Sequence, residues 1–227
     1  MDISEYIIKT PWDSRVFGLE TFEIVKASEY ILNLVFENNP KPGHYTVKTN
    51  PLFSKKILHN YGFYYCDTLI EPYCNINNFI EFKEEKSSIN DSIEIEELIK
   101  IAHGAFIHGR FHRDFNLDKN LADIRYELWL KDIYESQGVF GLMYDNNLAG
   151  FWGFANNKIV LHALSEEYRG RGLAKYFWSL ACQELFSRGH QELISSISAS
   201  NVRVLNLYSS LGFKFRNPLD VYHLLIK

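Results

Sequence analysis

The feature that most constrains this chain is a glycine- and arginine-rich turn between an expected strand and an expected helix. Residues 168–174 read YRGRGLA and follow the strand-like stretch Lys158–Leu164. Residues 172–188 then carry apolar side chains at helical spacing. Glycines let a backbone curl closely around a ligand, and the first turn of a helix offers unpaired N–H groups. With Arg169 and Arg171 beside them, this arrangement predicts a pyrophosphate site.

The sequence does not match two other known phosphate-binding turns. The dinucleotide fingerprint G-x-G-x-x-G fails because Lys175 stands where the third glycine is required. The P-loop fails because no GK[ST] occurs in the chain. The remaining alternative is a plain helix entry with two solvated arginines.

The order of expected elements is typical of an α/β fold, with a mixed central sheet flanked by helices. Strands are expected at residues 21–26, 45–48, 64–73, 139–144, 148–155, 158–164, 193–198 and 221–226. Helices are expected at residues 29–38, 52–60, 94–103, 122–136, 172–188 and 202–210. Asp145-Asn146-Asn147 has the composition of a hairpin turn, and Gly62 fits the position just after a helix.

The charge and apolar composition of the chain limit the kinds of partner that it can bind. The net charge is −4, from 24 basic and 28 acidic residues, and no basic run occurs, so no nucleic-acid partner is expected. Any phosphate should therefore be held locally, by backbone amides and a few arginines. No apolar run approaches the ~18 residues of a membrane span, and the N-terminus lacks an apolar leader, so no membrane partner is expected. Cys66, Cys74 and Cys182 fit free thiols in a reducing compartment, and we expect a cytoplasmic protein.

The chain also suggests two related halves. Residues 81–91 (EFKEEKSSIND) are charged and poor in large apolar side chains, so we interpret 83–92 as a linker between domains 1–82 and 93–227. Asn50, a short helix and Gly62-Phe63 echo Asn201, a short helix and Gly212-Phe213. The interpretation is a truncated copy before a complete one. The alternative is that any asparagine-capped helix ending in glycine has this pattern.

The turn resembles the acyl-CoA motif R/Q-x-x-G-x-G/A of the GNAT acetyltransferases, here Arg169-x-x-Gly172-x-Ala174. Asn201, Tyr208, Gly212-Phe213 and the final strand follow in the family's order. The resemblance implies a GNAT fold, N-acetyltransferase activity and acetyl-CoA as co-substrate, with Tyr208 as general acid. It implies acetyl-CoA contacts from Ala163, Leu164, Arg169, Gly170, Arg171, Gly172, Leu173, Ala174 and Asn201. Capping of a helix is the plainer alternative for Asn201.

A wider resemblance is to the GNAT enzymes that acetylate dTDP-fucosamine. Trp12-x-x-x-x-Phe17-Gly18 is similar to their opening motif. Residues 105–111 (AFIHGRF) followed by Tyr126-x-x-Trp129 resemble a second motif. The resemblance implies a nucleotide-activated, dTDP-linked amino-deoxysugar as partner, in lipopolysaccharide or other cell-surface polysaccharide synthesis, and leaves a homodimer open. Competing hypotheses are acetylation of a protein N-terminus, lysine or polyamine, and a non-catalytic acyl-CoA-binding module.

Several further residues are candidates for the acceptor substrate: Arg110, Phe111, His112, Arg113 and His162. Arginines suit nucleotide phosphates and an aromatic ring suits stacking, although a solvated basic loop has the same composition. His162 lies on the strand beside the acyl site and is a candidate base, with a water chain as alternative. His108 and His112 are four residues apart, but no Cys, Asp or Glu completes a recognisable ligand set, so no metal is expected.

Overall fold

A computed structural model describes residues 5–37 and 40–227, which form two compact units. Unit 1 contains Met1–Leu69, His108–Arg125 and Asn217–Lys227, and unit 2 contains Ile70–Ile107 and Tyr126–Arg216. These units do not follow the expected boundary at 83–92, because two segments from the second half of the chain belong to unit 1. The division into a truncated GNAT-like half and a catalytic half stays a prediction.

Unit 1 is a sheet in the order β1-β2-β3-β11-β4, with short helices. Its elements are β1 (Ile7–Lys9), α1 (Pro11–Phe17), β2 (Thr21–Ile24), α2 (Glu29–Phe36), β3 (Gly43–Thr49), α3 (Lys56–Asn60), the first part of β4 (Tyr64–Asn75), α5 (Arg110–Arg113), the start of α6 (Lys119–Glu135) and most of β11 (Lys214–Ile226). β2 and β3 are parallel, and β3 and β11 are antiparallel. Phe22, Ile24, Leu32, Val47 and Leu58 are among the side chains of its core.

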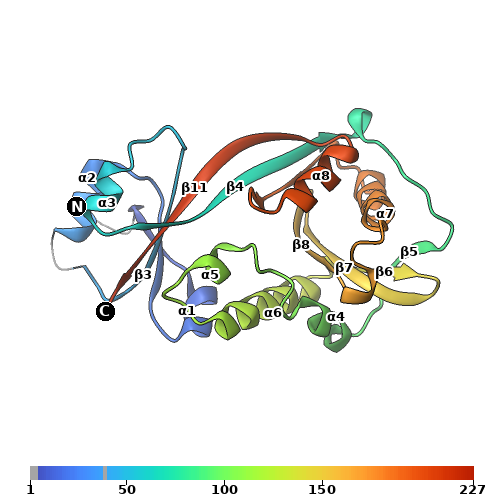
Figure 1. Ribbon diagram of the computed structural model, residues 1–227, viewed down its shortest axis with the longest axis horizontal. Helices are drawn as coiled ribbons and strands as arrows, with labels where there is room; N and C mark the ends of the chain where they lie inside the picture. Colours follow the sequence, from blue (N-terminus) through green and yellow to red (C-terminus); the bar gives the residue numbers. More distant parts are fainter. Residues whose placement is uncertain (1–4, 38–39) are drawn as a thin grey trace. The chain divides into compact units, whose positions relative to one another are not determined.

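Unit 2 is a sheet in the order β4-β9-β8-β7-β6-β5, covered by helices on both faces. Its elements are η2 (Ile76–Asn78), β5 (Ser87–Asn90), α4 (Ile95–Ala102), most of α6, β6 (Val139–Tyr144), β7 (Asn147–Ala155), β8 (Lys158–Leu164), η3 (Glu166–Tyr168), α7 (Ala174–Ser187), β9 (Glu192–Ser195), β10 (Ile197–Ser198) and α8 (Val202–Ser210), with the ends of β4 and β11. One core cluster holds side chains of α4 and α6 against the sheet, and another holds those of α7 and α8. The ribbons of these helices and of the sheet are drawn in Figure 1. The α/β class with a mixed sheet flanked by helices is confirmed.

Most elements lie where the residue pattern predicted them. The hairpin between β6 and β7 reverses direction at Asp145 and Asn146. Their φ values of 51° and 63° are tolerated best by Asn, Asp and Gly. Gly62 follows α3 with φ 84°, as expected of a residue just past a helix end. Ser28 caps α2 by accepting the N–H of Ile31.

Four expectations on local structure need correction. The expected linker contains β5, which pairs with β6, since short polar side chains suit a strand at a sheet edge. The helix expected at 52–60 begins only at Lys56, because Oδ1 of Asn50 accepts the N–H of Leu52 and forms a turn instead. The loop expected after α4 contains α5, and α1 was not expected. The helix expected at 29–38 ends at Phe36, and Asn38 lies outside the described residues.

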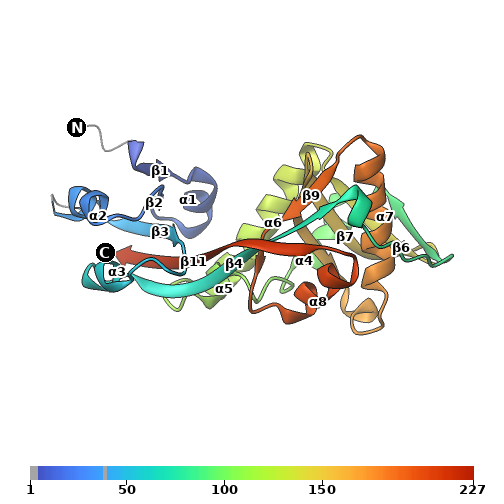
Figure 2. The same cartoon turned by 90° about the horizontal axis from the view of Figure 1, so that it is seen from above.

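The two units share one chain order, β-α-β-α-β. In unit 1 it reads β2-α2-β3-α3-β4, and in unit 2 it reads β8-α7-β9-α8-β11. In both, the first two strands of the series pair in parallel. The last strand of each series pairs outside its own series, because β11 pairs with β3 and β4 pairs with β9. This exchange is one reason why neither unit is continuous in sequence, and the other is that His108–Arg125 belongs to unit 1. β4 and β11 are neighbours in the sheet order and run side by side in both views (Figures 1 and 2).

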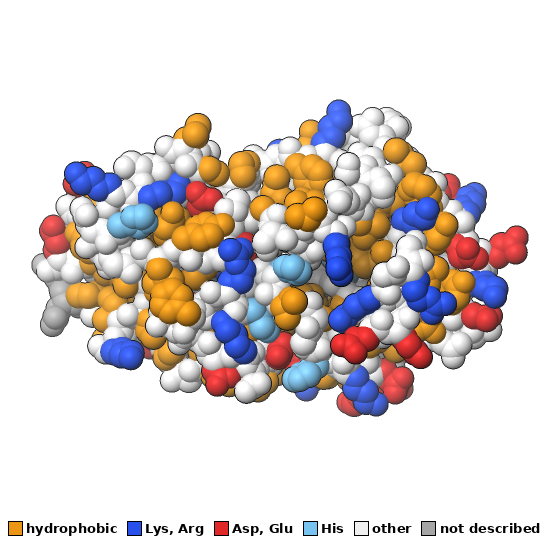
Figure 3. Space-filling model, viewed as in Figure 1, with side chains coloured by type: hydrophobic (Ala, Val, Ile, Leu, Met, Phe, Trp, Pro, Cys, Tyr) orange, Lys and Arg blue, Asp and Glu red, His pale blue; other side chains and the backbone are white. Residues whose placement is uncertain are grey.

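On the face shown in Figure 3, acidic and basic side chains are interspersed with hydrophobic ones. Among the described helices, none combines the length and apolar character of a membrane span.

Candidate functional site

The glycine-rich turn connects β8 to α7 in unit 2. Gly170 and Gly172 have φ values of 73° and 74°, a backbone conformation that L side chains rarely adopt. No heavy atom lies within 4 Å of the Cβ position of either glycine, so the turn faces open space. Arg169 and Arg171 are exposed on it. Nε of Arg169 donates to the carbonyl of Leu164 at 2.8 Å, which ties the turn to the end of β8.

The N-terminus of α7 has no side-chain cap. In this respect it differs from α2, where Ser28 accepts an amide, and from α8, where Oδ1 of Asn201 accepts the N–H of Val204 at 3.3 Å. A 14-residue helix carries partial positive charge at this end, and its first amides lack intrahelical acceptors. The turn and α7 therefore form the anion site that the sequence predicted, with Leu173 buried beneath it and Ala174 starting the helix.

Beside this turn, β8 separates from β9. The two strands pair only at Lys158–Ile194 and Ile159–Ser195. The N–H of Ser165 donates to Ala149 on the β7 side, so strand alternation directs the N–H of Leu164 to the opposite side, where β8 has no register partner among the described residues. Ala163, one residue earlier, is paired with Phe151 of β7 and buried.

Tyr208 of α8 reaches the same stretch of β8. Its hydroxyl lies 3.2 Å from Nε2 of His162, and its side chain is fully buried. His162 is only partly buried and meets the ring of Trp178 edge to face at 4.7 Å. Burial raises the pKa of Tyr208 above its ordinary value, so the phenol stays protonated. Burial also lowers the pKa of His162 to about 4, so the imidazole is neutral near pH 7.

Residues 97–213, just over half of the chain, match the family described as "Acetyltransferase (GNAT) family". The chain belongs to the GNAT acetyltransferase family. Acetyl-CoA is the co-substrate of this family, and the anion site of unit 2 fits its pyrophosphate. No curated protein matches this GNAT chain by sequence.

Solved structures share the fold of this GNAT chain at low identity. A GCN5-related N-acetyltransferase from Sphaerobacter thermophilus has a TM-score of 0.66 at 11% identity, covering 97% of this chain and 76% of that one. A GCN5-related N-acetyltransferase from Kribbella flavida has a TM-score of 0.60 at 11% identity, with 96% and 86% covered. A tandem GNAT protein from the clavulanic acid biosynthesis pathway has a TM-score of 0.55 at 11% identity, with 92% and 76% covered.

The acceptor candidates at 110–113 lie in α5 of unit 1 of the GNAT chain, whereas His162 lies in unit 2. Phe111 is buried against Phe17, with ring centroids 5.3 Å apart, so its ring has little exposed surface for stacking on a ligand. Nε2 of His112 pairs with Asp123 at 2.9 Å, and Arg113 pairs with Asp67 at 2.7 Å. In the part of the chain that the structure describes, Arg110 has a cation–π contact with Phe111 and no carboxylate partner.

A second titratable cluster of the GNAT chain was missed by sequence reasoning. His44, Asp114 and His223 of unit 1 are buried, and their ligand-type atoms lie within 4.8 Å of one another. Oδ2 of Asp114 accepts from Nε2 of His44 at 2.9 Å and from Nδ1 of His223 at 2.7 Å. Tyr64 and the N–H of Asn116 complete the acceptor sites of this carboxylate.

Nε2 of His223 is buried and has no hydrogen-bond partner among the described residues. The three side chains come from positions 44, 114 and 223, so no local spacing could have revealed them.

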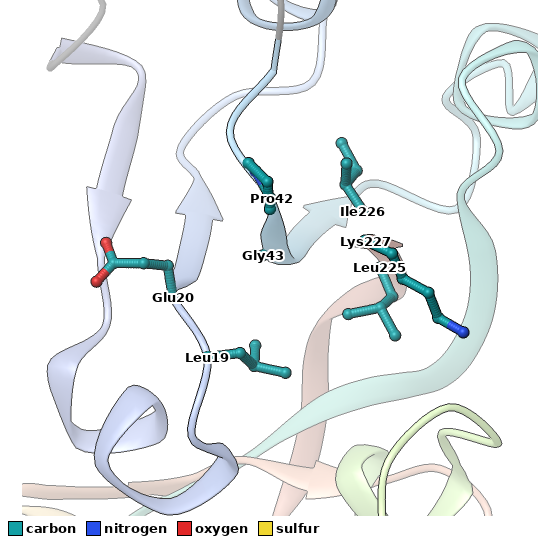
Figure 4. Close-up of a pocket in the computed structure, with 7 residues that line it drawn as sticks. All are labelled: Leu19, Glu20, Pro42, Gly43, Leu225, Ile226 and Lys227. Atoms are coloured by element: carbon teal, nitrogen blue, oxygen red, sulfur yellow. The ribbon is translucent and has the colours of Figure 1, made fainter.

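A pocket of about 460 Å³ in unit 1 lies between the start of β2, the start of β3 and the end of β11. Leu19 and Leu225 extend toward each other across it, and the carboxylate of Glu20 points away (Figure 4). Its lining is mostly apolar and contains none of the predicted site residues.

Proposed function

We propose that the chain transfers acetyl from acetyl-CoA to the amine of a nucleotide-linked, dTDP-type amino-deoxysugar for cell-surface polysaccharide synthesis in the cytoplasm, with Tyr208 as general acid. One observation supports the acyl-transfer part most. The open turn, the uncapped N-terminus of α7 and the Tyr208 hydroxyl all belong to unit 2 and surround the unpaired end of β8.

The reaction needs a polarised thioester carbonyl. The N–H of Leu164 is directed toward the unpaired side of β8, where a fixed backbone donor can stabilise the oxyanion of the tetrahedral intermediate. Such donors are already oriented in the free enzyme, so no reorganisation is needed during the reaction. We therefore assign the polarising contact to Leu164, and a packing role to the buried Ala163.

The departing thiolate needs a proton, and Tyr208 supplies it. A phenol is neutral near pH 7, so its proton is available when the thiolate forms. Asn201 fixes α8, which carries Tyr208, through its cap on Val204. The arginines at 169 and 171, with the amides at the start of α7, hold the pyrophosphate.

Unit 1 has the same order of strands and helices as unit 2, but it lacks the glycine- and arginine-rich turn and the tyrosine hydroxyl. The N–H of Phe213 donates to the carbonyl of Tyr208 at 3.0 Å, and the N–H of Phe63 donates to the carbonyl of Leu58 at 3.0 Å. Leu58 thus stands where Tyr208 stands in unit 2, and it has no hydroxyl. The connection from β2 to α2 spans only residues 25–28 and has no glycine or arginine. These differences support one acetyl-CoA site per chain and a truncated first copy.

The acceptor class rests on the second resemblance. Two of its motif residues meet in unit 1, where Phe17 packs on Phe111. Arg125 lies 5.3 Å from the same ring and pairs with Asp13 at 2.8 Å. Arg110, lying over Phe111, leaves a guanidinium for a nucleotide phosphate. Free, buried Cys66, Cys74 and Cys182 are consistent with a reducing compartment.

The test is CoA release from acetyl-CoA with a panel of dTDP- and UDP-linked amino sugars, peptides with free N-termini, lysine and polyamines. We expect turnover with a dTDP-linked amino-deoxysugar and at least tenfold lower kcat/KM with every peptide or polyamine. A preference for peptides or polyamines would replace the sugar with that acceptor class. Binding of acetyl-CoA without CoA release from any amine would favour the non-catalytic module.

A further inference from the structure

One face of the unit 1 sheet brings two buried histidines together. His44 lies in β3 and His223 lies in β11. In the antiparallel register His44 is opposite Leu225, two residues along the strand from His223. The two histidines are therefore diagonal neighbours on one face of the sheet. Their ring centroids lie 4.5 Å apart, and the side chains are 3% and 0% exposed. Because both rings stand on paired strands, their positions are well fixed.

The loop after α5 adds a buried carboxylate to this pair. Oδ2 of Asp114 lies 2.9 Å from Nε2 of His44 and 2.7 Å from Nδ1 of His223. Oδ1 of Asp114 accepts the N–H of Asn116 at 2.8 Å. The Tyr64 hydroxyl lies 3.0 Å from each carboxylate oxygen. These two donors fix the plane of the carboxylate, so that Oδ2 is held toward both imidazoles.

The distances in this cluster fit a shared metal ion. An ion about 2.0–2.1 Å from each ligand atom sets two ligands roughly 2.9 Å apart at a right angle and roughly 3.4 Å apart at a tetrahedral angle. The distance of 2.9 Å between His44 and Asp114 lies in this range, and the contact of His223 is shorter by about 0.2 Å. Two imidazoles and one carboxylate suit zinc and its first-row neighbours, whereas magnesium and calcium prefer oxygen ligands.

We propose that unit 1 binds one divalent transition metal of the zinc class through Nε2 of His44, Oδ2 of Asp114 and Nδ1 of His223. Without the ion, both imidazoles donate to the carboxylate. With it, each neutral ring carries its proton on the other nitrogen, and water or a small anion completes the coordination. The expectation of no metal concerns His108 and His112, which are not among these ligands. The groups assigned to acyl transfer belong to unit 2, so the two proposals are independent.

The surroundings of the cluster set the expected affinity. Metal-bound imidazoles commonly donate their second N–H, and loss of such an outer partner weakens metal binding by about 10–100-fold. Nε2 of His223 is buried and has no partner among the described residues. The guanidinium of Arg110 interacts electrostatically with His223 and opposes a second cation there. We therefore expect a dissociation constant for Zn²⁺ on the order of 10⁻⁶ M, weaker than that of a closed four-ligand site.

Calorimetry, cobalt spectroscopy and NMR on the chelator-treated full chain test the site. We expect one Zn²⁺ or one Co²⁺ per chain, with visible absorption of bound Co²⁺ stronger than that of the aqueous ion, and no measurable binding of Mg²⁺ or Ca²⁺. Nitrogen-15 spectra should show that Zn²⁺ moves the ring proton from Nε2 to Nδ1 in His44 and from Nδ1 to Nε2 in His223. Zinc binding weaker than about 100 µM, or binding without these changes, would overturn the proposal.

Conservative variants separate an ion site from a hydrogen-bonded network. His44→Gln and His223→Asn keep an amide N–H near the place of the imidazole N–H, so each retains a donor to Asp114 but loses a nitrogen ligand. Each should weaken Zn²⁺ binding by at least about 100-fold, more than an outer-contact change. Tyr64→Phe removes an outer contact of the carboxylate and should weaken binding by about 10–100-fold. Circular dichroism and urea unfolding check that each variant is folded.

His112→Asn is the matched control. His112 also pairs with a carboxylate in unit 1, 2.9 Å from Asp123, but it lies outside the cluster. This variant should leave the Zn²⁺ affinity within about threefold. Micromolar zinc binding that persists in the double variant His44→Gln/His223→Asn would place the ion on adventitious surface side chains and overturn the proposal. If the variants fail to fold, the cobalt spectrum and the ring tautomers of the unsubstituted chain decide.

Discussion

Nδ1 of His223 lies 2.7 Å from Oδ2 of Asp114, and neither side chain has exposed surface. Burial alone would raise the pKa of Asp114, but the hydrogen bonds from His223 and His44 hold it below its ordinary value. Burial lowers the pKa of His223 to about 3. The pair is therefore a carboxylate and a neutral imidazole that donates from Nδ1, and it ties β11 to the loop after α5 within unit 1.

The first prediction is acid sensitivity from this pair. The unfolded chain protonates His223 near pH 6.5, whereas the folded chain resists protonation until about pH 3. The unfolded state therefore binds more protons in this range, and the free energy of unfolding falls as the pH is lowered. We expect His223→Asn, which keeps a donor for Asp114 but does not titrate, to reduce that slope by about 1.4 kcal/mol per pH unit.

Urea unfolding at several values between pH 4.5 and 6.0 measures this slope. The control is His59→Asn, which removes an exposed histidine and leaves His44, Asp114 and His223 in place. Equal slopes in the unsubstituted chain and His223→Asn would show that His223 is protonated in the folded state.

The second prediction concerns the acetyl-CoA turn. Gly172→Glu places a carboxylate where the pyrophosphate is bound, and two like unit charges 4 Å apart near a surface repel by about 4 kcal/mol. We expect calorimetry to show a loss of affinity on the order of 10²–10³-fold. Gly189→Glu is the matched control, since Gly189 also has a positive φ of 98° and open space at Cβ, but lies after the C-terminus of α7. Equal losses in both variants would place the pyrophosphate elsewhere.

The third prediction is stoichiometry. Unit 1 has only a four-residue connection between β2 and α2, and Ser28 already caps the helix. Isothermal titration should therefore give one acetyl-CoA per chain. A second site with similar affinity would contradict the proposal that the first copy has lost its cofactor turn.

The fourth prediction concerns Tyr208. Tyr208→Phe keeps the ring that packs against Phe213 and removes the hydroxyl. We expect kcat to fall by roughly 10²–10⁴-fold, with little change in acetyl-CoA affinity. The cost in stability should be about 1 kcal/mol, from one buried hydrogen bond. Turnover within twofold of the unsubstituted chain, measured where chemistry limits the rate, would remove Tyr208 from the mechanism.

The fifth prediction concerns the turn that follows α8. Gly212 has φ 86°, and a Cβ there would lie within 3 Å of the carbonyl oxygen of Asn78. Gly212→Ala should therefore lower the free energy of unfolding by about 2–4 kcal/mol. Gly189→Ala has the same kind of backbone strain without a neighbouring atom, and it should cost less than half as much. Similar losses in both variants would mean that unit 2 relaxes away from the contact with Asn78.

The family and the acetyl-CoA turn could be predicted from sequence because their signals are local. The residues that shape the turn, Arg169 to Ala174, are consecutive in the chain. Positive φ at Gly170 and Gly172 can be expected from the glycines themselves, without knowing which distant residues lie nearby. The same holds for the hairpin at Asp145 and for the Asn201 cap. Periodicity placed β6, β8 and α8 at their observed bounds, since the spacing of apolar side chains reflects the face that each element buries.

The sequence alone determined the α/β class, the glycine-rich turn and the order of elements around it, because each depends on neighbours within a few residues. Only the tertiary structure decided that Phe111 is buried, that β11 pairs with β3, and that Asp114 accepts from both His44 and His223. It also brought His162 to Tyr208, 46 residues away. Such contacts join positions far apart in the chain. They depend on strand pairing and burial across a whole unit, and no local pattern encodes which distant side chains will meet.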